Sequence, residues 1–359
     1  MHFVRARHDR TLSRPQRIRR VRKDAGRQPA ARRQWRDRGG SGAFEKTLAA
    51  NRLLVGNGGI GADPVAAIQL YEEAAAGGSG AAAARLAVLA AVGVARDPNW
   101  GEALDRLTDA AELGDALAQQ QLAVIAGHDH ERMPEGGGAR WHNMRVGIDL
   151  KKILKPAPLR RVSTSPSIAE IDGLLTLGMC KWLVHRAEPR MERAQVIDYG
   201  TGKMVPDPNR TGLSAGFGLL DTDLVMVLAQ ERLARATGLI VHQQEPPHVL
   251  SYDPGQEFRQ HVDYLDPAIA AYHAELSLIG QRVATALTWL NDDFEGGETE
   301  FPRANVRFRR KPGDAILFLN VLQDSKAPDP MSLHAGLAPR RGKKWILSQW
   351  VRDRVQPII

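Results

Sequence analysis

PHVLSYDPGQEFRQHVD, residues 247–263, constrains the architecture of this 359-residue chain more strongly than any other segment. Its apolar start favours a β-strand that ends at Tyr252, and Asp253-Pro254-Gly255 is typical of a tight turn. A second extended run leads to His261 and Asp263, two potential metal ligands. Because residues i and i+2 of a strand point to the same side, we expect both side chains to face one ion.

A third ligand is expected from His334, in the segment SLHAG at residues 332–336. Two imidazoles and one carboxylate on one face of a metal ion leave three coordination positions open. That arrangement is typical of non-haem Fe(II) oxygenases, where the open positions take a bidentate 2-oxo acid and dioxygen.

Ten residues after His334, Lys344 begins the expected strand KWILSQWV. Alternation along a strand places Lys344, Ile346, Ser348 and Trp350 on one face, so a cation, a hydroxyl and an aromatic ring are expected to share one pocket. A buried lysine needs an anion, and the far carboxylate of 2-oxoglutarate is a suitable one. The phenol of Tyr252 is expected to add a hydrogen bond to that carboxylate.

Short apolar runs separated by turns fill the rest of the C-terminal half, which indicates an all-β barrel or sandwich with supporting helices. The expected strands are residues 247–252, 282–290, 315–319 and 344–351. The expected helices are residues 177–187 and 221–238.

Residues 45–127 are rich in alanine and leucine at helical spacing, and they repeat at an offset of 36 residues, with Gly78 falling on Gly114. Asp63-Pro64 and Asp97-Pro98 are each expected to precede the second helix of a helix-turn-helix unit, since proline suits a first helical turn. The stretch resembles Sel1-like repeats, short relatives of tetratricopeptide repeats. Two roles remain open for it: packing on the C-terminal domain, or binding a protein partner.

Positive charge is concentrated at the N-terminus. Residues 1–38 hold fourteen Arg or Lys against three Asp, whereas the whole chain has a net charge of +8. Such a segment is too polar to bury a core, so we expect a disordered basic tail over residues 1–42. Nucleic acid is not expected as a partner, except through electrostatic contact with this tail.

The organisation that we expect is a multidomain α + β chain. The tail is followed by an α-helical repeat block at residues 43–127, a Gly- and Pro-containing linker with one strand at 128–165, and a catalytic domain at 166–359. We expect no membrane span, because no run of 18 or more apolar residues occurs. The single cysteine, Cys180, cannot form an internal disulfide, so a cytoplasmic location is expected.

The ordered set of motifs from about residue 166 to residue 353 resembles the prolyl 4-hydroxylase-like branch of 2-oxoglutarate- and Fe(II)-dependent dioxygenases. It also includes MERAQVIDYGTGKMVPDPNRTGLSAGF at residues 191–217, which is similar to the region preceding the core of those enzymes. The motif residues are Tyr252, Gly255, His261, Asp263, Gly296-Gly297, Thr299, Phe301-Pro302, Pro312-Gly313-Asp314, His334, Gly342 and Lys344-Trp345.

The resemblance implies a double-stranded β-helix of the jelly-roll type, in which His261, Asp263 and His334 hold Fe(II) and Lys344 anchors 2-oxoglutarate. Tyr252 matches the tyrosine that assists this lysine. Thr299 and Ser348 match positions that line the same pocket. The sequence departs from the family pattern at Phe258 and Trp289, where tyrosines are frequent, and at Leu337-Ala338, where Cys-Pro is common. These departures leave substrate choice open.

The implied reaction is hydroxylation of an unactivated C–H bond with O2, releasing succinate and CO2, with ascorbate keeping the iron reduced. The substrate is expected to be a protein, a peptide or an amino-acid-like molecule, and peptidyl proline is the substrate that gives the family its name. Two competing hypotheses are a catalytically inactive Sel1-like adaptor with a degenerate barrel, and a metal-dependent enzyme of other chemistry, such as a cupin-like hydrolase or isomerase. Lys344 and Tyr252 argue against the last, because only a dicarboxylate co-substrate requires so distant an anchor.

Overall fold

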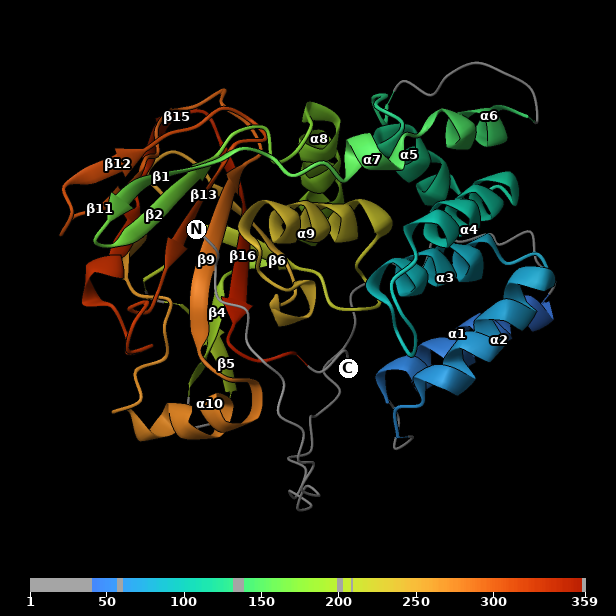
Figure 1. The fold of residues 1–359 in the computed structure, drawn as a ribbon, viewed down its shortest axis with the longest axis horizontal. Coiled ribbons are helices and arrows are strands. Elements are labelled where there is room, and N and C mark those ends of the chain that lie inside the picture. The colour runs from blue at the N-terminus through green and yellow to red at the C-terminus, as the bar shows by residue number, and fades with distance from the viewer. Residues whose placement is uncertain (1–40, 57–60, 132–138, 199–202, 208, 357–359) are drawn as a thin grey trace.

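The computed structural model describes residues 41–56, 61–131, 139–198, 203–207 and 209–356 (Figure 1). Nearly all of the predicted basic tail therefore lies outside the described residues, as does Gly136-Gly137-Gly138 of the predicted linker. The helix-rich N-terminal part lies beside a sheet-rich C-terminal part, as the sequence predicts.

The N-terminal part is built from helices that repeat at the predicted offset. The second pair of helices, α4 and α5, begins 36 residues after α2 and α3. Each begins where a short polar side chain accepts a hydrogen bond from a backbone N–H of the first turn, which satisfies a donor that has no partner within the helix. The helices are α1 (Ser41–Val55), α2 (Pro64–Ala76), α3 (Gly80–Val92), α4 (Trp100–Glu112) and α5 (Ala116–Ile125), and the caps of α2 to α5 are Asp63, Ser79, Asn99 and Asp115.

The two prolines of the repeat occupy different positions. Pro64 is the first residue of α2, as expected for a proline in a first helical turn. Asp97-Pro98 precedes α4 as expected, but Pro98 lies ahead of the cap Asn99 and outside the helix, so only its expected place in the first helical turn is wrong. The polar side chain of Asn99 accepts from the Glu102 N–H at 3.0 Å and sets the start of the helix by itself.

The predicted linker contains more structure than one strand. It holds α6 (Arg140–Gly147), α7 (Leu150–Ile153) and β1 (Leu159–Thr164). Trp141 and Met144, three residues apart on α6, are buried, and Arg145 forms an ion pair with Asp105 of α4 at 2.7 Å. The segment is too short and too polar for its sequence to show helical periodicity. Its two apolar side chains are nevertheless buried against the repeat block.

The C-terminal part holds two larger antiparallel sheets. The eight-stranded sheet has the order β1-β2-β13-β9-β16-β7-β6-β3, and the four-stranded sheet has the order β12-β11-β14-β8. The strands of the larger sheet are β1, β2 (Ser167–Ile171), β3 (Glu192–Arg193), β6 (Leu213–Gly216), β7 (His248–Tyr252), β9 (Arg282–Trp289), β13 (Ala315–Leu319) and β16 (Lys344–Arg352). Those of the smaller sheet are β8 (Phe258–His261), β11 (Thr299–Phe301), β12 (Val306–Phe308) and β14 (His334–Gly336). Two further pairs join β4 (Gln195–Asp198) to β5 (Lys203–Pro206) and β10 (Glu295–Gly296) to β15 (Pro339–Arg341).

These strands and helices confirm the predicted elements to within a few residues. The predicted helices are α8 (Leu177–Ala187) and α9 (Leu224–Thr237), and the four predicted strands are β7, β9, β13 and β16. The four-stranded sheet, formed from three- and four-residue strands, was not predicted as a set.

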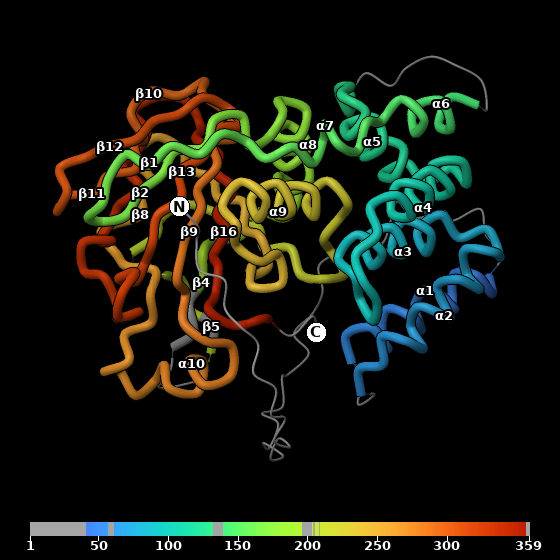
Figure 2. The backbone as a smooth tube through the Cα atoms, in the orientation of Figure 1, coloured from blue at the N-terminus to red at the C-terminus, as the bar shows by residue number. Residues whose placement is uncertain are grey.

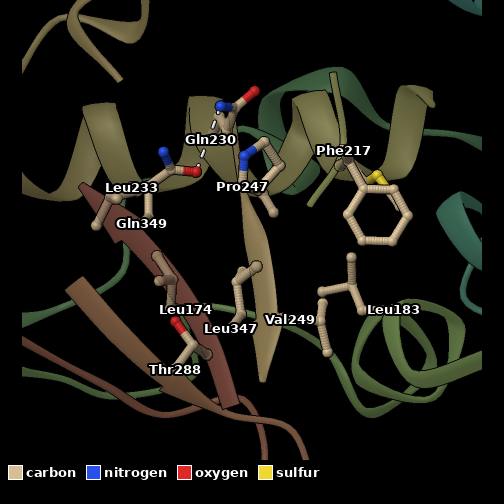
Figure 3. Close-up of a pocket in the computed structure, with 12 residues that line it drawn as sticks. Leu174, Leu183, Phe217, Gln230, Leu233, Pro247, Val249, Thr288, Leu347 and Gln349 are labelled. Carbon is tan, nitrogen blue, oxygen red and sulfur yellow. Dashed lines mark hydrogen bonds between the residues drawn. The ribbon is translucent and has the colours of Figure 1, made fainter. Parts of the chain in front are cut away.

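An aromatic core joins the two sheets. Phe301 and Phe308 of the smaller sheet pack with Trp289, Phe318 and Ile346 of the larger one. The opposite face of the larger sheet packs against α8 and α9. A cavity of about 10 Å³ remains beneath α9, where Gln230 donates a hydrogen bond to Gln349 at 3.3 Å (Figure 3). It is large enough for about one water molecule, so it is a packing defect and not a ligand site.

The helical block is part of the same core. Apolar residues of α3, α4 and α5 pack with those of α8 and α9 in one continuous cluster, and Figure 2 shows α9 between the sheets and the repeat helices. Gln121 of α5 accepts a hydrogen bond from the Leu224 N–H at the start of α9, at 2.9 Å. The block therefore has the packing role that the sequence left open, whereas a protein partner for it remains a prediction.

Arg85 of α3 fixes the loop between β6 and α9. Its guanidinium donates to the carbonyl oxygens of Leu219 at 2.6 Å, Leu220 at 2.5 Å and Thr222 at 3.0 Å. Three carbonyl groups of this loop are thus satisfied by one side chain from the other half of the molecule.

No helix in the described ranges is both long and apolar enough to span a bilayer.

Arg85→Met is expected to lower the free energy of unfolding by about 2 to 4 kcal/mol, because it removes charge-assisted hydrogen bonds to partly buried carbonyls. Equilibrium urea denaturation measures the change. The matched control is Arg106→Met on α4, whose ion pairs with Glu72 and Glu102 are more exposed. We expect it to cost less than about 1 kcal/mol. Equal losses in the two variants would contradict this role for Arg85.

Candidate metal centre and its pocket

His261 and His334 are neighbours across a β-ladder. His261 is the last residue of β8, His334 is the first residue of β14, and the two are paired in the antiparallel register. Their ring centroids are 4.2 Å apart. Two segments that are distant in sequence are therefore brought together by backbone pairing within the smaller sheet.

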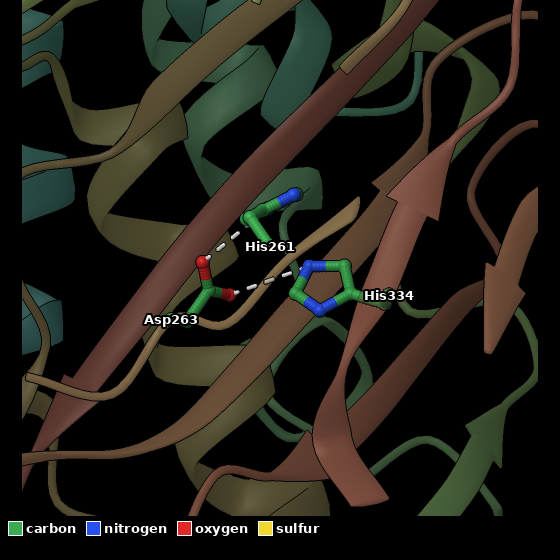
Figure 4. A group of neighbouring side chains, drawn as sticks. All are labelled: His261, Asp263 and His334. Atoms are coloured by element: carbon green, nitrogen blue, oxygen red, sulfur yellow. Dashed lines mark ion pairs between the residues drawn. The ribbon is translucent and has the colours of Figure 1, made fainter. Parts of the chain in front are cut away.

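Asp263 joins them from a different position than the sequence predicts. We expected His261 and Asp263 on one strand, but β8 ends at His261 and Asp263 lies in the bend that follows. The carboxylate nevertheless turns toward both rings, with Oδ1 3.7 Å from Nε2 of His261 and Oδ2 3.7 Å from Nε2 of His334 (Figure 4). One ligand atom from each residue lies within 4.8 Å of the others.

Hydrogen bonds to the backbone set the tautomers of both histidines. Nδ1 of His261 lies 2.7 Å from the Arg259 carbonyl oxygen, and Nδ1 of His334 lies 2.9 Å from that of Ser332. A carbonyl oxygen only accepts, so each Nδ1 carries a proton and Nε2 is the nitrogen of each ring that faces the carboxylate.

The charges of the cluster suit a divalent cation. Burial, together with His334, lowers the pKa of His261 to about 3, so this ring is neutral. Burial opposes ionisation of Asp263, but His334, His261 and the Thr285 hydroxyl favour the carboxylate, and the pKa of Asp263 lies below its usual range. Two imidazoles and one carboxylate are the donor set of non-haem Fe(II) sites, so the residues fit this metal.

The remaining predicted residues line the same pocket. Lys344, Tyr252, Thr299 and Ser348 surround the cavity into which the three ligands point. Lys344 and Tyr252 are paired across the β16–β7 ladder, and the ammonium lies 5.8 Å from the centre of the Tyr252 ring. The structure thus brings all seven predicted residues into one site.

Lys344 is buried without an ion pair to any residue in the described part of the chain. Its side chain is 2% exposed, and burial lowers its pKa to about 8, against a weaker opposing influence of Glu298. Burial also raises the pKa of Tyr252 to about 12, so this phenol keeps its proton and can donate. A cation and a hydroxyl donor in one pocket are suited to an anion.

Arg210 is a pocket residue to which the sequence assigned no role. It is 7% exposed, its guanidinium lies 5.0 Å from the centre of the Phe258 ring, and Phe258 stacks on His261 at 3.4 Å. Arg210 belongs to the motif segment 191–217, but that segment does not indicate that its side chain reaches the ligands.

Comparisons with known proteins agree with this geometry. A sequence model of the 2OG-Fe(II) oxygenase superfamily matches residues 247–352. Probable prolyl 4-hydroxylase 10 of Arabidopsis thaliana is 33% identical over 210 residues, covering 53% of this chain and 70% of that protein. Prolyl 4-hydroxylase 1 of the same plant is 32% identical over 232 residues, covering 60% and 78%.

A solved structure of a viral collagen prolyl hydroxylase from Paramecium bursaria Chlorella virus-1, in its 2OG complex, aligns with a TM-score of 0.40 and 24% identity. The alignment covers 52% of this chain and 95% of the viral one.

The alignments cover more than two thirds of each of the two plant enzymes. The superfamily match includes the whole His-Asp-His cluster and Lys344. The chain therefore belongs to the prolyl 4-hydroxylase-like oxygenases, enzymes that depend on Fe(II) and 2-oxoglutarate.

Proposed function

We propose that His261, Asp263 and His334 bind Fe(II), that Lys344 binds 2-oxoglutarate, and that the enzyme hydroxylates a prolyl residue of a peptide, forming succinate and CO2. The observation that carries the proposal is the pairing of two features in one pocket: a His-Asp-His cluster with its lone pairs converging, and a buried lysine without a counterion among the described residues.

The protein supplies position and electrostatics. Bound Fe(II), with the oxo acid and dioxygen, supplies the redox chemistry. The backbone carbonyls of Arg259 and Ser332 accept from Nδ1 of the two imidazoles and orient both rings so that Nε2 is the nitrogen available to the metal. The apolar side chains around them, among them Phe301 and Phe318, keep water away from the site.

The distal carboxylate of 2-oxoglutarate is the anion that Lys344 lacks. Tyr252, which remains a phenol, donates a second hydrogen bond to the same carboxylate, and the hydroxyls of Thr299 and Ser348 are proposed to complete its surroundings. Thr299 is 2% exposed and Ser348 is 1% exposed, so their polar groups are not satisfied by bulk water. Burying a dicarboxylate there replaces an unpaired cation with an ion pair.

A peptidyl proline is the substrate we favour over a free amino acid. The named relatives are prolyl 4-hydroxylases. Phe258 and Trp350 offer apolar surfaces for a pyrrolidine ring at the pocket, and Arg210 offers a donor for a peptide carbonyl.

We also propose a double-stranded β-helix, which is supported by the two sheets that share the aromatic core. The 36-residue helical period supports Sel1-like repeats at about 43–127, and we propose that a catalytic domain follows them at about 166–359. Ascorbate as a reductant and a cytoplasmic location remain predictions from the sequence.

Asp263→Ala is expected to abolish succinate formation coupled to a proline-containing peptide, since a metal ligand is lost. The measurement is peptide mass, which gains about 16 Da for one inserted oxygen atom, together with succinate. Asp266→Ala removes an exposed carboxylate from the same loop, whose Oδ1 only accepts from the Ala268 N–H. We expect it to retain turnover within about twofold. Coupled turnover by Asp263→Ala would refute the metal assignment.

Lys344→Met is expected to weaken 2-oxoglutarate binding by at least about 30-fold, since removing one partner of a buried ion pair costs about 2 kcal/mol or more. Anaerobic titration of the Fe(II)-loaded protein, followed by the visible charge-transfer band of the bound oxo acid, measures the change. Lys343→Met is the control, because the Lys343 side chain is 40% exposed and its ammonium pairs with Asp253 on the surface. Equal affinity in both variants would exclude Lys344 as the anchor.

The same substitution is expected to stabilise the free protein at pH 7. The folded-state pKa of Lys344 is about 8 and the ordinary value is 10.5, which corresponds to a burial penalty of about 3 kcal/mol. The unfolded chain binds more protons between these values, so the penalty is complete below pH 8 and declines as the pH rises toward 10.5. Urea denaturation at pH 7 and pH 10 should show the advantage of Lys344→Met shrinking, and an advantage independent of pH would contradict this cause.

A further inference from the structure

Asp263 is held by a side chain of the other sheet. The residue lies beyond the end of β8, so the ladder that fixes His261 does not continue to it. Its carboxylate Oδ2 instead accepts a hydrogen bond from the hydroxyl of Thr285, on β9 of the eight-stranded sheet, at 2.6 Å. Thr285 is 1% exposed and Asp263 is 6% exposed, so this contact is protected from water.

The donors and acceptors of this contact allow one arrangement. A carboxylate only accepts, so the single proton of the Thr285 hydroxyl points to Asp263. The Thr285 oxygen then accepts from Nδ2 of Asn320 at 2.9 Å. Asn320 is 0% exposed, and its Oδ1 has no hydrogen-bond partner within the described residues. The amide thus donates to Thr285 while its own acceptor stays unsatisfied, at a cost in free energy.

The backbone of Asn320 is connected to the second histidine. Its N–H donates to the Val283 carbonyl and its C=O accepts from the Asp329 N–H, both at 2.9 Å. Asp329 caps the short 3-10 helix η4 (Pro330–Ser332), and the carbonyl of Ser332 accepts from Nδ1 of His334. One buried residue therefore supports the carboxylate through its side chain and the segment before His334 through its backbone.

We infer that Thr285 and Asn320 are positioning residues of the metal centre, which orient Asp263 so that one carboxylate oxygen is engaged by the protein and the other is free for the metal. A carboxylate held in this way would bind a metal through one oxygen. The position that its second oxygen would otherwise occupy would then stay available to the 2-oxo acid or to dioxygen. This inference rests on the proposed iron site.

The test is metal affinity in the full chain, measured by anaerobic titration with Co(II) in four single variants and in the double variant that combines Thr285→Val with Asn320→Leu. Thr285→Val removes the hydroxyl at nearly constant volume, and Thr285→Ser restores it. Asn320→Leu removes the donor behind it. Thr288→Val is the matched control, because Thr288 is a buried threonine on the same strand that lines the cavity beneath α9 on the opposite face of the sheet.

We expect Thr285→Val to weaken Co(II) binding by about 10- to 100-fold and to alter the visible spectrum of the bound ion, while Thr285→Ser and Thr288→Val resemble the unsubstituted protein. Asn320→Leu should weaken binding in the same direction by a smaller factor. The double variant should bind no more weakly than Thr285→Val alone, because both changes act through one hydrogen-bonded chain.

Two results overturn the inference. If Thr285→Val binds Co(II) with unchanged affinity and spectrum, whether or not its melting temperature falls, Thr285 is merely structural. A failure of the unsubstituted protein to bind Co(II) or Fe(II) would instead overturn the iron site itself, and with it the proposed function.

Discussion

The antiparallel pairing of β8 with β14 is the contact on which the metal centre depends. It places His261 directly opposite His334, and the side chains of a strand alternate between its two faces. A shift of one residue in this register would turn one imidazole away from the pocket. The smaller sheet has short strands, and its neighbours secure the register: β14 also pairs with β11, and the Phe301 ring of β11 stacks near His334 at 5.6 Å between centroids.

The site combines groups that are unfavourable to bury in the absence of ligands. Lys344 has no counterion among the described residues, and a carboxylate and two imidazoles face one another at close range. The apolar core that joins the two sheets provides the stability that permits this arrangement. The low dielectric constant of the site makes these groups unfavourable to bury, and it also strengthens their interaction with bound ions. Binding of a metal ion or of a dicarboxylate is therefore expected to raise the free energy of unfolding.

The sequence predicts the chemistry of the site better than its geometry. That His261, Asp263, His334 and Lys344 share one pocket is predictable from the sequence, because a metal site or an anion site restricts residue type and order along the chain. The longer strands and helices are predictable because their apolar periodicity is sustained over several residues.

The remaining features depend on contacts between distant segments. Asp263 lies outside β8 because its side chain bonds to Thr285 on another sheet, and no local pattern encodes this partner. Asn320 and Arg210 appear in the sequence as ordinary polar residues, and only the packed strands bring them to the ligands. α6 was missed because two buried side chains, Trp141 and Met144, are too few to establish a period.

The contacts between the repeat helices and α9, with Arg85 holding the loop before α9, limit which segment of this chain could be transferred to another protein. The segment that matches the superfamily model, residues 247–352, lacks α8 and α9, whose apolar side chains cover one face of the larger sheet. α9 in turn buries apolar surface against α3 and α5. The segment matched by the superfamily model is therefore smaller than the packed unit, and a transplanted segment of this size would need α8 and α9 to cover its sheet, with the repeat helices or a substitute to cover α9.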